Sequence, residues 1–461
     1  MVKNLLCLSH TLLTGIILWG SYVLPANATA PLFASGHYFD GKLQRPFLAY
    51  SQDSGKSWEY PPSINQSPLP GNFMDGELSN TICNKDICIA IGAYYNNEVI
   101  STPLIVESRD KGSTWSWPDL LSNPALPAKF HDGWFNNATC TKTSCFVAGL
   151  YHDDIGSKPF LAMKTNNSIT WNYVKIELPS NFQEGWFTDI DCNNATCIAV
   201  GTWSDAQNTG HALLAASKDN GETWQTKTPS ENSIYPSGTS SAFLYSATCN
   251  KTLCIAAGDY TQAMTTRPLL TISRDNGNTW TSPTVSLPDN FQSGWFSDTD
   301  CNQELCIASG AYSNGHTTLP LLFFSNDNGK TWTSSKHTNK SIHINYGTWS
   351  SATCSDKGCI AAGSFENENG MHPFIAVSDN GTNWHYPPSA IIPNPSAKPD
   401  NGFFSKVTCI KNTCTASGSY RNNAICFPLL AVSNDYGNNW VYPESVNDPK
   451  NLPPDFVNGH F

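Results

Sequence analysis

One short motif that recurs eight times constrains this chain more than any other feature. Its clearest copy spans residues 273–280 and reads Ser-Arg-Asp-Asn-Gly-Asn-Thr-Trp. Close variants, and one degenerate copy at residues 164–171, end at Trp58, Trp115, Trp171, Trp224, Trp332, Trp384 and Trp440. The copies therefore follow one another at intervals of 52 to 57 residues. A period of this length predicts a repeat architecture in which each unit is one supersecondary element.

The cysteines supply a second recurring element. Seven pairs each enclose four residues, with turn-forming residues between two β-prone runs, which is the signal of a hairpin. Cysteines that face each other across a hairpin can form a disulfide, whereas metal binding would call for paired histidines that are absent. We therefore expect disulfides between Cys83 and Cys88, Cys140 and Cys145, Cys192 and Cys197, Cys249 and Cys254, Cys301 and Cys306, Cys354 and Cys359, and Cys409 and Cys414. Cys426 is left over, and we expect it to be free.

Each repeat divides into four short strands. In the third repeat these lie near residues 134–141, 145–151 and 159–164, and after Trp171. Residues 33–58 lack the first strand and its cysteines, while residues 455–461 match the start of a first strand. The two partial repeats complete one unit only if the chain ends meet, which favours a ring over a linear solenoid. We expect an all-β, eight-bladed β-propeller of four-stranded blades, closed by pairing of the N- and C-terminal half-repeats, with one cystine hairpin in seven blades.

The first residues read as an export signal. Lys3 provides a positive charge, residues 12–18 are apolar, and Ala26-Asn27-Ala28 offers a small-x-small cleavage pattern. We expect cleavage after Ala28, which leaves residues 29–461 as a single propeller domain. No other stretch approaches the roughly 18 apolar residues that a membrane span needs. The expected product is a monomer without a membrane span, secreted or located in the periplasm or outside the cell, where disulfides persist.

Charge and motifs restrict the partners. The formal net charge is -11, which argues against nucleic acid or an anionic membrane. The chain contains no phosphate-binding loop, no zinc-binding His-Glu-x-x-His and no Gly-x-Ser-x-Gly, so we expect neither a cofactor nor a metal. The expected partner is a glycan or an extracellular protein. Four histidines are expected to be solvated loop residues rather than metal ligands: His152, His211, His316 and His372.

The repeated motif resembles the Asp-box, or BNR repeat, of sialidase-like β-propellers. The resemblance covers essentially the whole chain after the export signal. It implies that the box turn lies between the third and fourth strands, on the face away from the ligand, and the cystine hairpins must then share that face. Asp275 can accept backbone N–H bonds within its turn, Gly277 permits a positive φ and Trp280 can pack into the blade. We expect a structural role for the box aspartates Asp53, Asp110, Asp219, Asp275, Asp327, Asp379 and Asp435.

Two rows of residues, mostly aromatic, border the opposite face. One row ends the second strand of each blade: Tyr38, Tyr94, Tyr151, Trp203, Tyr260, Tyr312, Phe365 and Tyr420. The other opens the first strand, where Glu77, Thr348 and His460 interrupt the aromatic series Trp134, Trp186, Phe243, Trp295 and Phe403. Such rows can stack on sugars or fill the seams between blades. Our candidate ligand-binding residues on this face are Trp134, Trp186, Trp203, Trp295, Tyr151 and Arg267.

A polar row three positions before the first cysteine of each pair is expected to line the central channel: Asn80, Asn137, Asp189, Ser246, Asp298, Ser351 and Lys406. Two of its members, Asp189 and Asp298, are candidate catalytic residues, because two carboxylates on one ring can act as acid and base. Solvated channel acids are the alternative.

The sialidase active-site pattern is not matched. The resemblance would imply three arginines that hold the sugar carboxylate. Of the five arginines in the chain, Arg109 and Arg274 lie inside boxes, and Arg45 and Arg267 belong to repeats on opposite sides of the ring. We therefore expect an exported non-catalytic β-propeller that binds a carbohydrate or protein ligand through the face opposite its Asp-boxes. The alternative is a glycoside hydrolase, sialidase-like or another exo-acting glycosidase, that uses the channel carboxylates.

Overall fold

The computed structural model describes residues 30–65, 73–97, 100–118, 126–193, 195–227, 234–337, 344–368, 370–390 and 401–461. Its helical elements are short: α1 (Pro62–Asn65), α2 (Glu444–Asn447) and the 3-10 turns Pro388–Ala390 and Pro449–Asn451. Within these ranges no helix has the length and apolar character to cross a membrane. The expected export signal lies outside the described residues.

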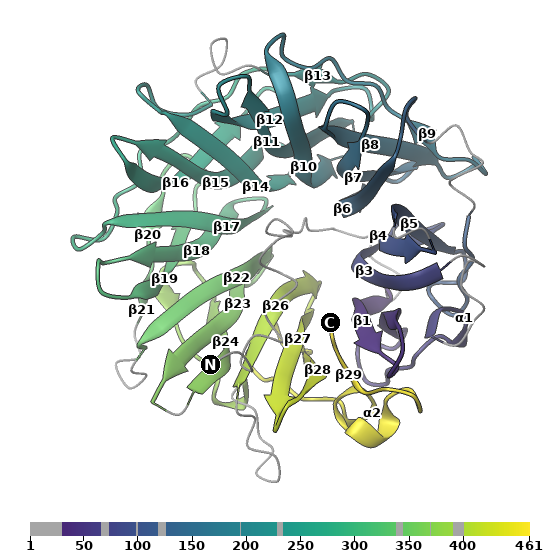
Figure 1. Ribbon diagram of the computed structural model, residues 1–461. Coiled ribbons are helices and arrows are strands. Elements are labelled where there is room, and N and C mark those ends of the chain that lie inside the picture. Colours follow the sequence, from purple (N-terminus) through teal and green to yellow (C-terminus); the bar gives the residue numbers. More distant parts are fainter. Residues whose placement is uncertain are drawn as a thin grey trace.

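Antiparallel sheets follow one another around a central axis, as in a β-propeller (Figure 1). The strands nearest the axis are β3 (Phe73–Cys83), β6 (Asp132–Cys140), β10 (Phe182–Asn193), β14 (Ser241–Cys249), β17 (Ser293–Asn302), β22 (Tyr346–Ser355) and β26 (Asn401–Ile410). Each pairs outward with a second strand: β4 (Cys88–Asn96), β7 (Ser144–His152), β11 (Thr196–Asp205), β15 (Cys254–Gln262), β18 (Leu305–Ser313), β23 (Gly358–Asn367) and β27 (Thr413–Asn422). The third strands are β5 (Ser101–Ser108), β8 (Ser157–Thr165), β12 (Gly210–Ser217), β16 (Thr265–Ser273), β19 (Thr318–Ser325), β24 (Gly370–Ser378) and β28 (Ile425–Ser433).

A fourth strand is present in only three blades, as β9 (Asn172–Tyr173), β13 (Gln225–Thr226) and β20 (Thr333–Ser334). The residue three positions after the box tryptophan explains the difference. In these blades it is Val174, Lys227 or Ser335, and its N–H donates to the third strand. Elsewhere it is a proline, which has no N–H to extend the ladder, and the fourth strand shrinks to a single bridge: Pro61, Pro118, Pro283, Pro387 and Pro443.

The chain ends meet in a separate three-stranded sheet. It contains β1 (Leu32–Phe39), β2 (Gln44–Ser51) and the three-residue β29 (Asn458–His460), which pairs with β1 from His37 to Phe39. The expectation of eight four-stranded blades therefore needs correction. Seven blades are complete and carry a cystine hairpin, and the end sheet has neither a cystine nor a full inner strand. One further small sheet pairs β21 (Lys336–His337) with β25 (Asn383–Trp384) in parallel.

The seven expected cysteine pairs are disulfide-bonded, and the two cysteines of each pair are directly opposite each other at the end of the first hairpin of a blade. The expectation for Cys426 was wrong. Cys426 is disulfide-bonded as well, to a partner outside the described residues, and no described cysteine is free. The reason is that pairing by hairpin spacing considers only neighbours in sequence, and Cys426 is 8% exposed on the third strand β28, where it has no such neighbour.

The Asp-box turn is held by its own side chains. Asp275 accepts hydrogen bonds from the backbone N–H of Thr279 (2.9 Å) and from the hydroxyls of Ser273 and Thr279. Burial alone would raise the pKa of Asp275, but these hydrogen bonds outweigh it and the net pKa is lowered. Gly277 has a φ of 80°, and its carbonyl accepts the indole N–H of Trp280 at 3.2 Å. Trp280 then packs on Ile198 and other residues of the preceding blade, so the box closes the seam between blades.

Two boxes depart from this plan. In the seventh, the turn is one residue shorter, and Asn380 accepts the bonds from Ser378, Thr382 and Asn383. The expected structural role of Asp379 was therefore wrong, because Asn380 takes the place of the box aspartate.

In the degenerate third box, Lys164 stands where the other boxes have serine. It forms a buried ion pair with Glu107 of the preceding blade, with Nζ–Oε distances of 2.6 and 2.7 Å. The indole N–H of Trp171 donates to the same carboxylate at 2.8 Å rather than to a box carbonyl. A charged network thus replaces the missing box contacts.

Candidate functional site

The box turns and cystine hairpins share one face, so the turns between second and third strands lie on the opposite face. Among the described residues, nine large hydrophobic side chains are exposed. Seven of them lie at the strand ends and turns of this opposite face: Met74, Tyr95, Ile155, Met264, Tyr346, Ile425 and Val457. Exposed apolar groups gathered on one face favour an interaction surface there.

At the centre of this face is a ring of eight equivalent, partly exposed residues, which we call the mouth ring: Glu77, Trp134, Trp186, Phe243, Trp295, Thr348, Phe403 and His460. Each lies near the start of an inner strand (Figure 1). Four consecutive blades contribute Trp134, Trp186, Phe243 and Trp295, which form an aromatic arc. The other half of the ring is mixed and more polar.

A β-bulge determines where the mouth ring points. In the third blade the register shifts between Phe135 and Asn137, so Trp134 and Asn137 lie on the same side of the strand although three positions separate them. Asn137 belongs to the row nearest the axis, and Trp134 therefore faces the axis as well. The bulge brings the carbonyl of Trp134 so close to the second strand that a Cβ on Gly149 would overlap it. A glycine stands at this position in every blade and, as Gly36, in the end sheet.

Two tryptophans of the arc are held by short side-chain contacts. The indole N–H of Trp134 donates to Asn136 at 3.1 Å, and that of Trp295 donates to Ser297 at 3.1 Å. These bonds fix the rings while one side of each stays accessible. Fixed, partly exposed indoles are suited to stack on the apolar face of a flat ligand such as a sugar ring.

Opposite the arc lies a polar group made of His37, Glu77 and His460. His37 Nδ1 is 3.3 Å from Glu77 Oε2, and the rings of His37 and His460 are 4.1 Å apart. His37 is the residue of β1 that pairs with His460 of β29, so the meeting of the chain ends creates this group. Sequence reasoning noted Glu77 and His460 only as interruptions of the aromatic row, and it missed His37 because nothing local in the sequence brings residues 37 and 460 together.

The aromatic row of the second strands lies deeper. Trp203 is 5% exposed and stacks between Phe182 and His211, with a ring-centroid distance of 4.4 Å to His211. Tyr151 is 8% exposed and packs against Phe160. These side chains fill the blades and their seams, which was the alternative considered for this row. Ligand contact by Trp203 or Tyr151 would require their neighbours to move.

Arg267 opens the third strand β16 of the fifth blade, opposite Tyr260. It is partly exposed, and its buried Nε has no hydrogen-bond partner among the described residues. Arg267 thus remains a candidate polar contact at the edge of the face, away from the mouth ring.

The two candidate catalytic aspartates lie on the axis below the mouth ring, in a belt of hydrogen bonds. Asp189 is fully buried and accepts from the side chain of Asn137 and from the backbone N–H of Ala247 at 2.7 Å. Asp298 accepts from the hydroxyls of Ser246 and Ser351 at 2.8 and 2.9 Å. Each aspartate therefore joins the blades on both sides of its own.

Burial dominates the electrostatics of this belt. It raises the pKa of Asp298 to about 7 against opposing hydrogen bonds, and it raises the pKa of Asp189 well above its usual range. Burial also lowers the pKa of Lys406, the one cation of the row, to about 7, while the nearby aspartates oppose this shift. The expected solvated channel acids are thus buried structural acids, enclosed by the strands that carry them.

Several histidines of this face pair with a carboxylate. His152 lies 2.6 Å from Asp132, and His211 lies 2.9 Å from Asp205. His372 contacts Asn367 at 3.1 Å. In the described part of the chain, no group of three or more His, Cys, Asp or Glu residues is arranged to hold a metal ion.

No protein-family model matches the chain, and no curated protein matches its sequence. Solved structures do match in fold. YCF48 bound to D1 peptide is 14% identical with a TM-score of 0.39, over 72% of this chain and 89% of that one. Hadza microbial sialidase Hz136 is 14% identical with a TM-score of 0.39, over 76% and 74%. A PL25 ulvan lyase is 12% identical with a TM-score of 0.45, over 84% and 100%. The resemblance to sialidase-like β-propellers therefore holds at the level of the fold.

Proposed function

We propose that this chain is an exported, non-catalytic β-propeller that binds a carbohydrate or protein ligand through the face opposite its Asp-boxes, with the mouth ring as the centre of the site. The observation that carries the proposal is the arc of Trp134, Trp186, Phe243 and Trp295, partly exposed on four consecutive blades. Seams need the same residue in every blade, whereas the mouth ring changes from aromatic to polar around the axis.

The arrangement favours a carbohydrate as ligand. Sugar rings present an apolar face that stacks on indole and hydroxyl groups that need hydrogen-bond partners. The arc supplies the first, and His37, Glu77 and His460 supply the second across the axis. The seven cystines are in keeping with an oxidising compartment, so we place the protein outside the cytoplasm.

The buried belt weighs against the glycosidase alternative. A catalytic acid must lie within hydrogen-bond reach of the bond it protonates. Asp189 and Asp298 are at most 1% exposed and use both carboxylate oxygens to join neighbouring blades.

The test is a glycan array run beside a panel of fluorogenic glycosides, with the full chain and a Trp186→Ala variant. We expect a defined group of glycans to bind, binding to weaken in the variant, and no glycoside to be cleaved. Cleavage of a glycoside by the full chain would contradict the non-catalytic reading. Binding that is unchanged in Trp186→Ala would contradict the proposed site.

A further inference from the structure

The inner strand of the end sheet begins like that of every blade. The carbonyl of His460 lies over Gly36, as that of Trp134 lies over Gly149. Phe461 then takes the core position, where its ring stacks on Phe47 with a centroid distance of 4.9 Å. Its carbonyl accepts from the hydroxyl of Ser405 at 3.2 Å, as the carbonyl of Phe135 accepts from Ser79. The end sheet thus follows the common pattern as far as Phe461.

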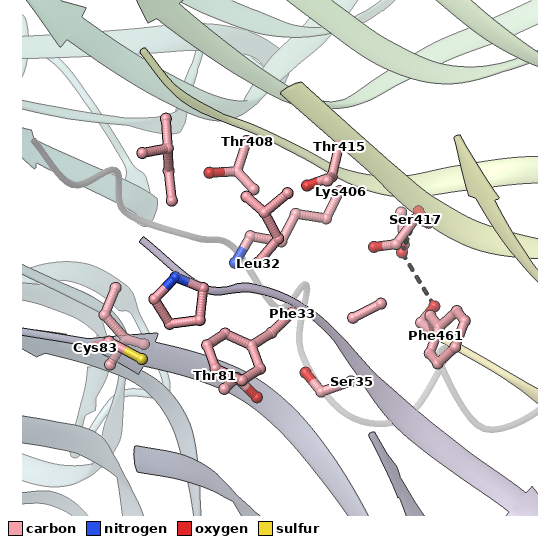
Figure 2. Close-up of a pocket in the computed structure, with 15 residues that line it drawn as sticks. Leu32, Phe33, Ser35, Thr81, Cys83, Lys406, Thr408, Thr415, Ser417 and Phe461 are labelled. Carbon is pink, nitrogen blue, oxygen red and sulfur yellow. Dashed lines mark hydrogen bonds between the residues drawn. The ribbon is translucent and has the colours of Figure 1, made fainter. Parts of the chain in front are cut away.

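Beyond Phe461, the position of the inner strand is a cavity of about 90 Å³ (Figure 2). Its walls come from Leu32 to Ser35 of β1, from the end of β3 at Thr81 to Cys83, and from β26 and β27. At Leu32 to Ser35, β1 pairs with β2 on its outer side, and β29 reaches β1 only from His37 onward. Among the described residues, this part of β1 therefore has no strand on its inner edge. An open strand edge is a template for a further strand.

Polar groups of the cavity lack what an inner strand provides elsewhere. The hydroxyl of Thr81 is buried and has no hydrogen-bond partner among the described residues. Lys406 extends to Asn80 on the far side, where Nζ donates to Oδ1 at 3.3 Å. In the complete blades, belt neighbours such as Asn80 and Asn137 bond directly. At the end sheet the belt lacks a member, and the long side chain of Lys406 bridges the gap.

We propose that this cavity binds an extended peptide segment of another protein, which adds to β1 as the missing inner strand, antiparallel to it and with an acidic residue directed at Lys406. The chain's own repeats define the occupant. In the third blade the corresponding residues are 136–140, Asn-Asn-Ala-Thr-Cys. The second position faces the axis, where Asp189 and Asp298 show that a carboxylate fits, and the third is often alanine. The fourth is a threonine in several blades. Main-chain hydrogen bonds to β1 supply affinity, and the carboxylate supplies specificity.

This site is separate from the mouth ring. Phe461 and His460 lie at its upper end, and the cavity extends from there toward the cystine face. On binding, Lys406 is expected to turn from Asn80 to the peptide carboxylate, which then completes the belt. The inference does not depend on the proposed carbohydrate site, and variants of the aromatic arc should leave it unchanged.

The test uses the full chain and the acetylated, amidated peptide Ser-Asp-Ala-Thr-Ser in calorimetric titrations. A peptide with Lys in place of Asp is the matched control, and we expect it to bind about 10-fold more weakly. Lys406→Met should remove this preference, whereas Lys411→Met, which changes an exposed lysine, should retain it. Trp186→Ala should bind the Asp peptide as the unchanged chain does, which separates this test from that of the mouth ring.

A second arm keeps the test decisive if Lys406→Met does not fold. The five peptide residues are fused directly after Phe461, and the fused strand should raise Tm and abolish binding of the free peptide. A photo-crosslinker on the free peptide should label the tryptic fragment that contains Leu32 to Ser35. The proposal is overturned if the peptide does not bind at millimolar concentration, if the fusion leaves its binding intact, or if it labels the mouth ring instead.

Discussion

The buried ion pair of the third blade gives the sharpest test of how the ring is held together. Lys164 is 4% and Glu107 8% exposed in their side chains, and Trp171 is fully buried beside them. Lys164→Met keeps the volume but leaves a buried carboxylate with the indole N–H of Trp171 as its remaining printed-sequence neighbour in this network. Breaking a buried pair from one side costs about 3 to 5 kcal/mol. We expect a loss of that size in the free energy of unfolding, measured by urea denaturation.

The double variant separates the pair from its parts. Glu107→Gln with Lys164→Met removes both charges and retains an amide oxygen for Trp171. We expect it to be more stable than the sum of the single variants by about 2 kcal/mol, the scale of coupling between residues in one network. Lys175→Met, at an exposed position of the same blade, should change stability by less than about 0.5 kcal/mol. Additive costs, or a Lys164→Met variant as stable as Lys175→Met, would refute the compensating role of the pair.

The remaining predictions concern the box, the belt and the cystines. Trp280→Ala should lower the free energy of unfolding by about 3 to 5 kcal/mol without a separate effect on ligand affinity, and normal Tm with lost binding would reverse the assignment of the faces. The pKa of Asp298 is raised to about 7 from an unfolded value near 4, so the folded state binds its proton more tightly, and this contribution to stability is present below about pH 4 and lost as pH rises through 7. Asp298→Asn should therefore flatten the fall in stability between about pH 4 and 7 in urea titrations, and an unchanged slope would argue against the buried acid. Under non-reducing conditions, peptide mapping should recover seven hairpin cystines and find Cys426 protected from alkylation, whereas an alkylated Cys426 would contradict its bonded state.

Repetition made most of the fold predictable. Because each unit is compared with its neighbours in the same chain, the hairpin cysteines, the strand order and the place of the box turn could be read from spacing alone. The same comparison failed where a unit changes length or loses a member. In the seventh box, a one-residue deletion moved the capping role from Asp379 to Asn380. The missing fourth strands could have been expected, since a proline three residues after the tryptophan marks all five.

The candidate site was less predictable because it depends on contacts between distant residues. The mouth tryptophans were identified from their place in the repeat, but Trp203 belongs to a row that the bulge and strand order place inside the blade. The exposure of Asp189 and Asp298 depends on neighbouring blades, whose side chains and backbone N–H groups enclose them. His37 could be linked to His460 only once the two chain ends were paired.

The most direct test of the central claim compares ligand affinity across three variants. For the glycan that binds best on the array, titrations with Trp186→Ala should show affinity weakened by about 1 to 3 kcal/mol, the scale of one lost aromatic anchor. Asp189→Asn should bind almost as the unchanged chain does, and Trp203→Ala should lower Tm more than affinity. The opposite result would contradict a binding protein: a glycoside that is hydrolysed by the unchanged chain and no longer hydrolysed by Asp189→Asn, with the fold and the affinity of Trp186→Ala intact.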